Sequence, residues 1–364
     1  MLVQRARDFA IWLFFHAGYP YRPEEPWPES IVDMHCHVAG IGAGGSGCFV
    51  SGEFRKDLRY CLFLCSFGFT GKKLREEGDD RLADRISEMV RQSKHVDKAV
   101  LLAWNGVYGN DGELDKKQTQ VYVPNEFVVR AVARHTNLLF GASVNPYRKD
   151  ALKCLEWAKR QGAVLVKWVP SVMLINPDEK SDEKKRESLI RFYEKLVALD
   201  LPLLTHTGDE QSFPHPENDL ADSEKLALPL SLRVRVIAAH CASLGKYENK
   251  HGEEETGVVR LLRMMEKHPN LYADISALTQ WNRRGAMKDA LTQKELLGRL
   301  LYGSDFPLIN TVLVSPWNFI RRLTPGNFFS IGRTKNPWDK DVRIRQALGT
   351  PSAVFNRFRE EFMH

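Results

Sequence analysis

Short apolar runs rich in β-branched residues alternate along this chain with longer stretches in which apolar and polar residues mix. Each short run is bounded by polar or turn-forming residues, which is typical of strands in repeated βα units. The pattern predicts eight strands, at residues 30–38, 98–104, 138–145, 163–169, 201–207, 234–240, 270–276 and 299–305.

The stretches between these runs show the periodicity of amphipathic helices. In SLIRFYEKLVAL, one helical face holds Leu189, Phe192, Leu196 and Leu199. In TGVVRLLRMMEKH, the corresponding face holds Val258, Leu261, Leu262 and Met265. We therefore expect a helix to cover each crossover between consecutive strands.

Eight strands with intervening helices predict an α/β fold of the (β/α)₈ type, a TIM barrel, with functional groups at the carboxyl ends of the strands. A doubly wound open sheet is the alternative, and it requires a glycine-rich turn that opens a helix. The glycines from Gly40 to Gly45 match G-x-G-x-x-G, but the residues that follow, SGCFVSGEFRKDL, do not begin a helix at the third glycine. The pattern favours the barrel.

The spacing of the runs predicts where the chain departs from a minimal barrel. The first two strands start 68 residues apart, at 30 and 98, so residues 39–80 form a long insertion over the barrel mouth. The chain after the eighth strand is long enough for extra helices that cap or close the barrel. We expect residues 1–29 to pack on the barrel as an N-terminal segment, and residues 30–364 to form one domain.

Composition narrows the class of protein. The 364 residues are 43% hydrophobic and 27% charged, which indicates a globular chain with a substantial core. The balance of 52 Lys and Arg against 46 Asp and Glu is only mildly basic, so the charge argues against nucleic acid as a partner and is compatible with an anionic small-molecule substrate. Six cysteines without a C-x-x-C pair favour a reducing compartment, and no stretch is long enough to span a bilayer. We expect a cytoplasmic protein without a membrane partner, and the sequence is compatible with a homo-oligomer.

Polar residues that can bind a metal lie at the ends of five predicted strands. They are His35 and His37 on the first strand, Lys167 on the fourth, His206 on the fifth, His240 on the sixth and Asp305 on the eighth. Neutral imidazole and carboxylate suit Zn²⁺, Mn²⁺ or Fe²⁺. A metal ion that keeps an open coordination position can bind a water there and lower its pKa. A lysine repels a metal unless its amine has reacted with CO₂ to give an anionic carbamate. Asp305 would serve both as a ligand and as the acceptor of a proton from the attacking water.

These residues and motifs resemble the amidohydrolase superfamily. The resemblance rests on D-x-H-x-H at Asp33, on the residues above and on GSDFP, and it covers residues 30 to about 307. VKWVPSV and the C-terminal NPWDKDVRIRQALG are more similar to the branch called amidohydrolase-2. The resemblance implies a metal-dependent TIM-barrel hydrolase that attacks an amide, lactone or ester bond, with Zn as the expected metal and Asp305 and His240 as catalytic residues.

The resemblance leaves two reactions open. In a two-metal hydrolase, His35, His37 and Asp305 hold the first ion, His206 and His240 hold the second, and carboxylated Lys167 bridges them. The branch also includes nonoxidative decarboxylases and hydratases. In those lyases one ion is held by the H-x-H pair, His206 and Asp305, and His240 stays free as a catalyst. Lys167 favours the two-metal hydrolase.

The seventh predicted strand ends in DISALTQWNRRGAMK, and the loop in this stretch carries further candidates that would face the pocket. We expect Trp281, Arg283 and Arg284 to bind substrate, because arginine can hold a carboxylate through two parallel hydrogen bonds. A solvated loop is the alternative interpretation of the same residues. The sequence does not identify the substrate.

Overall fold

The protein is described by a computed structural model of residues 30–249 and 251–363. The predicted N-terminal segment, residues 1–29, lies outside the described residues. The described chain contains the eight predicted strands and, as predicted, at least one helix in each crossover between them.

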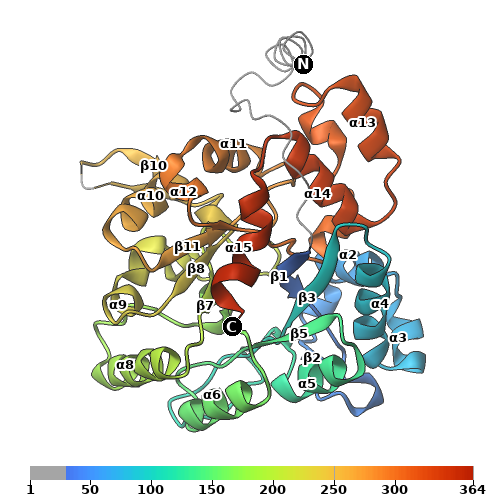
Figure 1. The fold of residues 1–364 in the computed structure, drawn as a ribbon. Helices are drawn as coiled ribbons and strands as arrows, with labels where there is room; N and C mark the ends of the chain where they lie inside the picture. Colours follow the sequence, from blue (N-terminus) through green and yellow to red (C-terminus); the bar gives the residue numbers. More distant parts are fainter. Residues whose placement is uncertain (1–29, 250, 364) are drawn as a thin grey trace.

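The eight parallel strands form a TIM barrel, which confirms the predicted fold class (Figure 1). In the order of the sheet they are β1 (Ile31–His37), β3 (Val96–Leu102), β5 (Leu138–Ala142), β6 (Leu165–Trp168), β7 (Leu203–His206), β8 (Val236–Ala239), β11 (Leu271–Asp274) and β12 (Leu300–Leu301). Sequence order and spatial order agree, as expected when each helix returns the chain to the next parallel strand.

The barrel closes between the chain after β12 and β1. The amide of Asp305 donates to the carbonyl of His35 at 2.8 Å, and the amide of His37 donates to the carbonyl of Phe306 at 2.8 Å. A parallel bridge pairs Cys36 with Phe306. This seam brings the predicted ligands of the first and eighth strands onto adjacent backbones.

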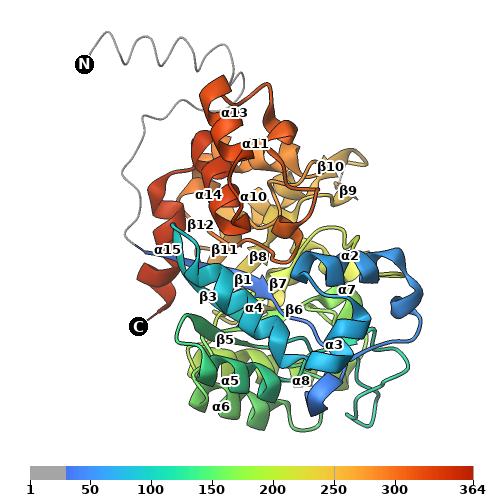
Figure 2. The same ribbon diagram turned by 90° about the vertical axis from the view of Figure 1, so that its right-hand side faces the viewer.

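Helices surround the barrel on its outer side (Figures 1 and 2). Those that cover the crossovers are α4 (Asp80–Arg91), α5 (Asn125–Arg134), α6 (Ala151–Arg160), α8 (Glu183–Ala198), α9 (Ala227–Ser231), α10 (Gly257–Lys267), α11 (Arg284–Thr292) and α12 (Lys294–Leu297). The apolar face predicted for α8 is buried at Leu189, Phe192 and Leu196. Within residues 30–249 and 251–363, no helix has the length and apolar character needed to cross a membrane.

The long insertion after the first strand is present and has its own structure. It contains β2 (Phe49–Val50), the 3₁₀ turn η2 (Phe54–Lys56), α2 (Leu58–Phe67) and α3 (Gly71–Glu77). β2 pairs antiparallel with β4 (Val121–Tyr122), a short strand after β3. Figure 2 shows α2 beyond the carboxyl end of β1, so the insertion lies over the mouth of the barrel.

The C-terminal extension forms α13 (Pro325–Gly332), α14 (Pro337–Ala347) and α15 (Ser352–Phe362). α15 lies at the opposite end of the barrel from α2 (Figure 2). Its Phe358 and Phe362 join the apolar side chains inside the barrel, which are Val32, Met34, Val100, Leu102, Leu165, Leu204, Ile237, Ala239 and Leu301. Apolar side chains therefore pack the amino-terminal end of the barrel, and the predicted metal ligands lie toward its carboxyl end.

Candidate metal centre and pocket

A bulge in β1 aims both of its histidines at the barrel mouth. The pairing of β1 with β3 shifts between Asp33 and Cys36, where β1 has one residue more than its partner. Met34 packs inside the barrel and Cys36 packs in the outer core. Strict alternation from Met34 would turn His35 and His37 outward, and the extra residue reverses this.

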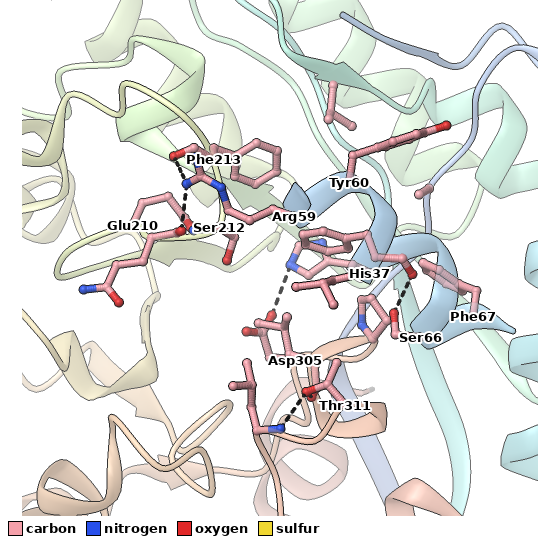
Figure 3. A pocket seen from close by; sticks show the side chains of 18 of the residues that line it. His37, Arg59, Tyr60, Ser66, Phe67, Glu210, Ser212, Phe213, Asp305 and Thr311 are labelled. Atoms are coloured by element: carbon pink, nitrogen blue, oxygen red, sulfur yellow. Dashed lines mark hydrogen bonds and ion pairs between the residues drawn. The ribbon is translucent and has the colours of Figure 1, made fainter. Parts of the chain in front are cut away.

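Donor atoms from three strands converge on the Nε2 atom of His35. The Nε2 atom of His37 lies 3.2 Å away, the Nζ atom of Lys167 3.1 Å away and the Oδ1 atom of Asp305 3.5 Å away. The Oδ1 atom of Asp305 is also 3.5 Å from the Nε2 atom of His37, a contact drawn in Figure 3. Two ligands bound tetrahedrally to zinc at about 2.0–2.1 Å lie about 3.3–3.4 Å apart. The donor atoms of His35, His37 and Asp305 therefore fit one divalent ion.

The two single histidines lie beside this group. The ring of His240 lies 5.1 Å from that of His35 and 4.9 Å from that of His206, between ring centres. Ligand atoms of His35, His240 and Asp305 all lie within 4.8 Å of one another. All six residues predicted as metal ligands thus gather at one end of the barrel.

Two of these residues have strained backbones. Asp305 and His240 have φ angles of 62° and 59°, in the left-handed region that side chains with a Cβ atom disfavour. Strain of this kind persists only where the surrounding structure holds it, and it is concentrated at functional sites. Gly303 adds a close approach, because a Cβ atom at that position would lie 2.7 Å from the Cβ atom of His35.

Asp274, at the end of β11, supports the site and was not among the predicted residues. Its carboxylate accepts hydrogen bonds from the Nδ1 atom of His35 and from the backbone amide of His240, both at 2.8 Å. A carboxylate on Nδ1 places the proton there, so the Nε2 atom of His35 keeps its lone pair for a metal. The position of Asp274 near the carboxyl end of the predicted strand 270–276 was the signal that could have identified it.

Ser276 and Glu210 are two further residues that sequence reasoning missed. The Nδ1 atom of His240 lies 2.8 Å from the hydroxyl and 3.2 Å from the carbonyl of Ser276. Because a carbonyl only accepts, Nδ1 donates and the Nε2 atom of His240 keeps a lone pair. Glu210 is buried, and its Oε2 atom lies 3.5 Å from the Nδ1 atom of His206. Its position four residues after His206 was the available signal.

Burial sets the protonation states of the site. It lowers the pKa of His35, His37 and His240 well below the usual range of imidazole, and it lowers that of His206 to about 4, so all four are neutral at pH 7. Neutral imidazole is the form that binds metals. Burial also lowers the pKa of Lys167, because the interior disfavours the charged ammonium, and neighbouring carboxylates oppose this effect. The same loss of hydration raises the pKa of Asp305.

A pocket of about 400 Å³ opens above the site. The candidate ligands that line it are His37, Lys167, His206, His240 and Asp305. Tyr60, Ser66 and Phe67 of α2 contribute to its wall, as Figure 3 shows. Trp281 and Arg283 also line it, whereas Arg284 is exposed at the start of α11 and lines a separate surface hollow with Trp317.

Comparisons with known proteins identify the family of this chain. The family whose model matches residues 32–315 is described as amidohydrolase, and that match covers most of the chain. No curated protein matches the sequence. Among solved structures, an uncharacterized TIM-barrel protein from Bordetella bronchiseptica is 16% identical, covers 88% of this chain and 99% of that one, and has a TM-score of 0.49.

Two further solved structures are enzymes by their descriptions. An amidohydrolase from Burkholderia multivorans with bound HEPES is 11% identical, with 88% of this chain and 100% of that one covered and a TM-score of 0.44. A dihydroorotase from Campylobacter jejuni is 14% identical, with 95% and 88% covered and a TM-score of 0.39. Likeness at this level carries no argument about the reaction.

Proposed function

Because the chain belongs to the amidohydrolase family, we propose that it is a metal-dependent hydrolase that uses an activated water to break an amide, lactone or ester bond of a small molecule. One observation carries the proposal. The donor atoms of His35, His37 and Asp305 lie 3.2–3.5 Å apart, as ligands of one ion should, and His37 and Asp305 line a pocket of about 400 Å³.

The donor set suits zinc, with manganese or iron as alternatives, because it combines imidazole nitrogen with carboxylate oxygen. A divalent ion at this position supplies Lewis-acid activation of water. The protein supplies the proton chemistry. Asp305 is buried and its pKa is raised by burial, so its carboxylate accepts a proton more readily than an exposed one. The Nε2 atom of His240 keeps a lone pair and offers a second proton site in the pocket.

Lys167 determines whether one or two ions bind. It is 1% exposed, and its lowered pKa increases the fraction of neutral amine that can react with CO₂. That reaction forms an N–C bond and releases one proton, and the resulting carbamate is anionic. Carboxylated Lys167, His206 and His240 would then hold a second ion. The hydrolase proposal includes this second site.

A single-metal lyase, either a nonoxidative decarboxylase or a hydratase, is the second candidate. The observation in its favour is that His35, His37 and Asp305 form a three-ligand set without Lys167. His240 would then stay unligated, with its Nδ1 atom held by Ser276 and its Nε2 atom available to substrate.

The experiment is elemental analysis combined with reaction assays on the full chain, purified without chelator after growth with added metal. We expect close to two metal equivalents after exposure to bicarbonate. Hydrolysis of lactones and aryl esters is followed by proton release, hydrolysis of cyclic amides by the free amine that ring opening exposes, and decarboxylation of aromatic acids by CO₂ release. One equivalent with CO₂ release would favour the lyase, and less than about 0.3 equivalents would contradict both metal-dependent functions.

A further inference from the structure

Arg283 is a buried cation without an anionic partner among the described residues. The residue is 7% exposed, and its Nη1 atom donates to the hydroxyl of Ser243 at 2.5 Å. Its Nε atom is buried without a hydrogen-bond partner, and within the described chain no carboxylate forms an ion pair with the guanidinium. A buried charge is expensive unless it is paired, so this arrangement indicates that the partner is a ligand.

The acids that share the pocket with Arg283 are already engaged. Asp305 lies 3.5 Å from both His35 and His37, where it would bind the metal. Glu210 accepts a hydrogen bond from the amide of Ser212 at 2.5 Å and lies beside His206. Because Nη1 is used by Ser243, the free edge of the guanidinium is the one formed by Nε and Nη2. Two parallel N–H groups on one edge match the two oxygens of a carboxylate.

The pocket has an apolar wall that is continuous with the candidate metal centre. We define the aromatic wall as Phe54, Tyr60, Phe63, Trp104 and Phe213, all of which line the pocket. Ring-centre distances of 5.1 Å from His37 to Trp104, 5.0 Å from Trp104 to Phe213 and 5.0 Å from Phe213 to Phe54 connect its members. Figure 3 shows Phe213 and Tyr60 around the same hollow as His37 and Asp305. These three ring pairs are tilted, and a wall of closely spaced rings favours an aromatic or otherwise flat apolar ligand.

We propose that the substrate is a small amphipathic acid, whose ring-bearing body packs on the aromatic wall while its carboxylate binds the Nε–Nη2 edge of Arg283. This inference rests on the proposed function of the same site, because it takes the metal centre to be the reacting end of the pocket. It also gives the insertion a role, since Phe54, Tyr60 and Phe63 all lie in the segment between β1 and β3.

The test is calorimetric binding of probe compounds to the full chain, both treated with chelator and loaded with zinc. The probes are 3-phenylpropionate, 3-phenylpropan-1-ol, acetate and phenylphosphonate. We expect the phenylpropionate to bind at least tenfold more tightly than the alcohol, which lacks the charge, and than acetate, which lacks the ring. Arg283→Met should weaken phenylpropionate at least tenfold and change the alcohol less than twofold. Arg284→Met, one residue away and outside this pocket, is the matched control and should change neither.

Two more variants keep the proposal falsifiable if Arg283→Met does not fold. Arg283→Lys keeps the charge but loses the two-pronged edge, and it should weaken phenylpropionate at least threefold. Phe213→Leu should weaken the acid and the alcohol equally and leave acetate unchanged.

Three results would overturn the inference. In the first, Arg283→Met and Arg284→Met bind phenylpropionate equally tightly. In the second, phenylpropionate binds only when zinc is present and its affinity does not change on substitution of Arg283. In the third, phenylphosphonate binds more tightly than phenylpropionate. Each would leave the metal content of the same samples unchanged, so the proposed function would survive. Arg283-dependent acid binding in a chain that takes up no metal would support the substrate class and contradict the metal-dependent function.

Discussion

The two ends of the barrel are built from the same eight strands and have opposite interiors. At the amino end, apolar side chains pack together inside the barrel, among them Val32, Met34, Phe358 and Phe362. At the carboxyl end, histidines, a lysine and an aspartate lie close together. Burial lowers the pKa of His35 and of Lys167 and raises that of Asp305, so it favours the neutral form of each. Burial of apolar side chains at the amino end stabilises the folded state. Burial of ionisable groups at the carboxyl end destabilises it, because these groups lose their hydration.

This difference indicates that stability and activity depend on different ends of the barrel. Substitutions at the amino end should lower the free energy of unfolding and leave the chemistry intact. Substitutions at the carboxyl end should do the reverse, because polar groups held at an active site are a common source of lost stability. Four substitutions test this separation.

Removing an aromatic ring from the amino end should have the largest effect. Phe358 is 1% exposed and stacks on Phe362 with 5.6 Å between ring centres. Phe358→Ala should lower the free energy of unfolding by about 3–5 kcal/mol, because the cavity is enclosed by the barrel. Denaturant unfolding measures this, with Phe329→Ala, an exposed ring on α13, as the control within about 0.5 kcal/mol. If folded Phe358→Ala also bound much less metal per chain than the parent protein, the separation would be contradicted.

Neutralising the carboxylate at the opposite end should remove activity instead. Asp305→Asn deletes a candidate metal ligand and proton acceptor, so turnover should fall by a factor on the order of 10² or more. Burial disfavours the charged carboxylate, so the metal-free variant should be as stable as the parent chain or more stable. Asp80→Asn, on the exposed surface of α4, should change neither quantity. Near-normal turnover by Asp305→Asn would remove Asp305 from its proposed role.

The comparison also shows which features were predictable from sequence. The eight strands follow from apolar runs, and the candidate ligands follow from the rule that parallel strands present their carboxyl ends together. Trp281 and Arg283 lie on the pocket as expected, and Arg284 begins α11 on the exposed surface. Adjacent arginines on one loop point in different directions, and sequence spacing alone did not decide which one faces inward.

Other features depend on contacts between segments far apart in the chain. Alternation from Val32 and Met34 would have turned His35 outward, and only the bulge against β3 restores it. A bulge is a relation between two strands, so a pattern along one of them does not reveal it. Asp274 was visible at a strand end, but its partner, the Nδ1 atom of His35, lies 239 residues away.

Substitution of Asp274 should weaken metal binding less than substitution of a ligand does, and more than substitution of a surface residue does. Asp274→Asn keeps the shape but removes the charge that holds the proton of His35 on Nδ1, so metal affinity should fall about 10- to 100-fold. Competition with a chelator of known affinity measures this. Asp289→Asn on α11 is the matched control, and it should bind metal as the parent does. If Asp274→Asn also bound metal normally, the tautomer of His35 would not depend on this carboxylate.

The smallest effect is expected at the seam where β1 meets the chain after β12. Asp33, the aspartate of the D-x-H-x-H motif, does not face the metal centre. Its carboxylate accepts hydrogen bonds from the amide of Ser304 at 2.8 Å and from the indole Nε1 of Trp338 at 2.7 Å. Trp338 also stacks on Phe306, with 4.7 Å between ring centres. Asp33 therefore ties β1 to the chain after β12 and to α14, next to the bulge that aims the histidines.

Trp338→Phe removes the indole donor and keeps an aromatic ring on Phe306. Because Ser304 still satisfies the carboxylate, we expect the free energy of unfolding to fall by about 1.5 kcal/mol, the lower end of the range for a hydrogen bond to a charged group. Trp317→Phe, at a ring that is 67% exposed, should stay within about 0.5 kcal/mol. Metal affinity should change less than threefold, since the histidines keep their backbone bonds to the seam. A tenfold loss of metal affinity in Trp338→Phe would show that the seam positions the ligands as well as closing the barrel, and that the two ends are coupled through Asp33.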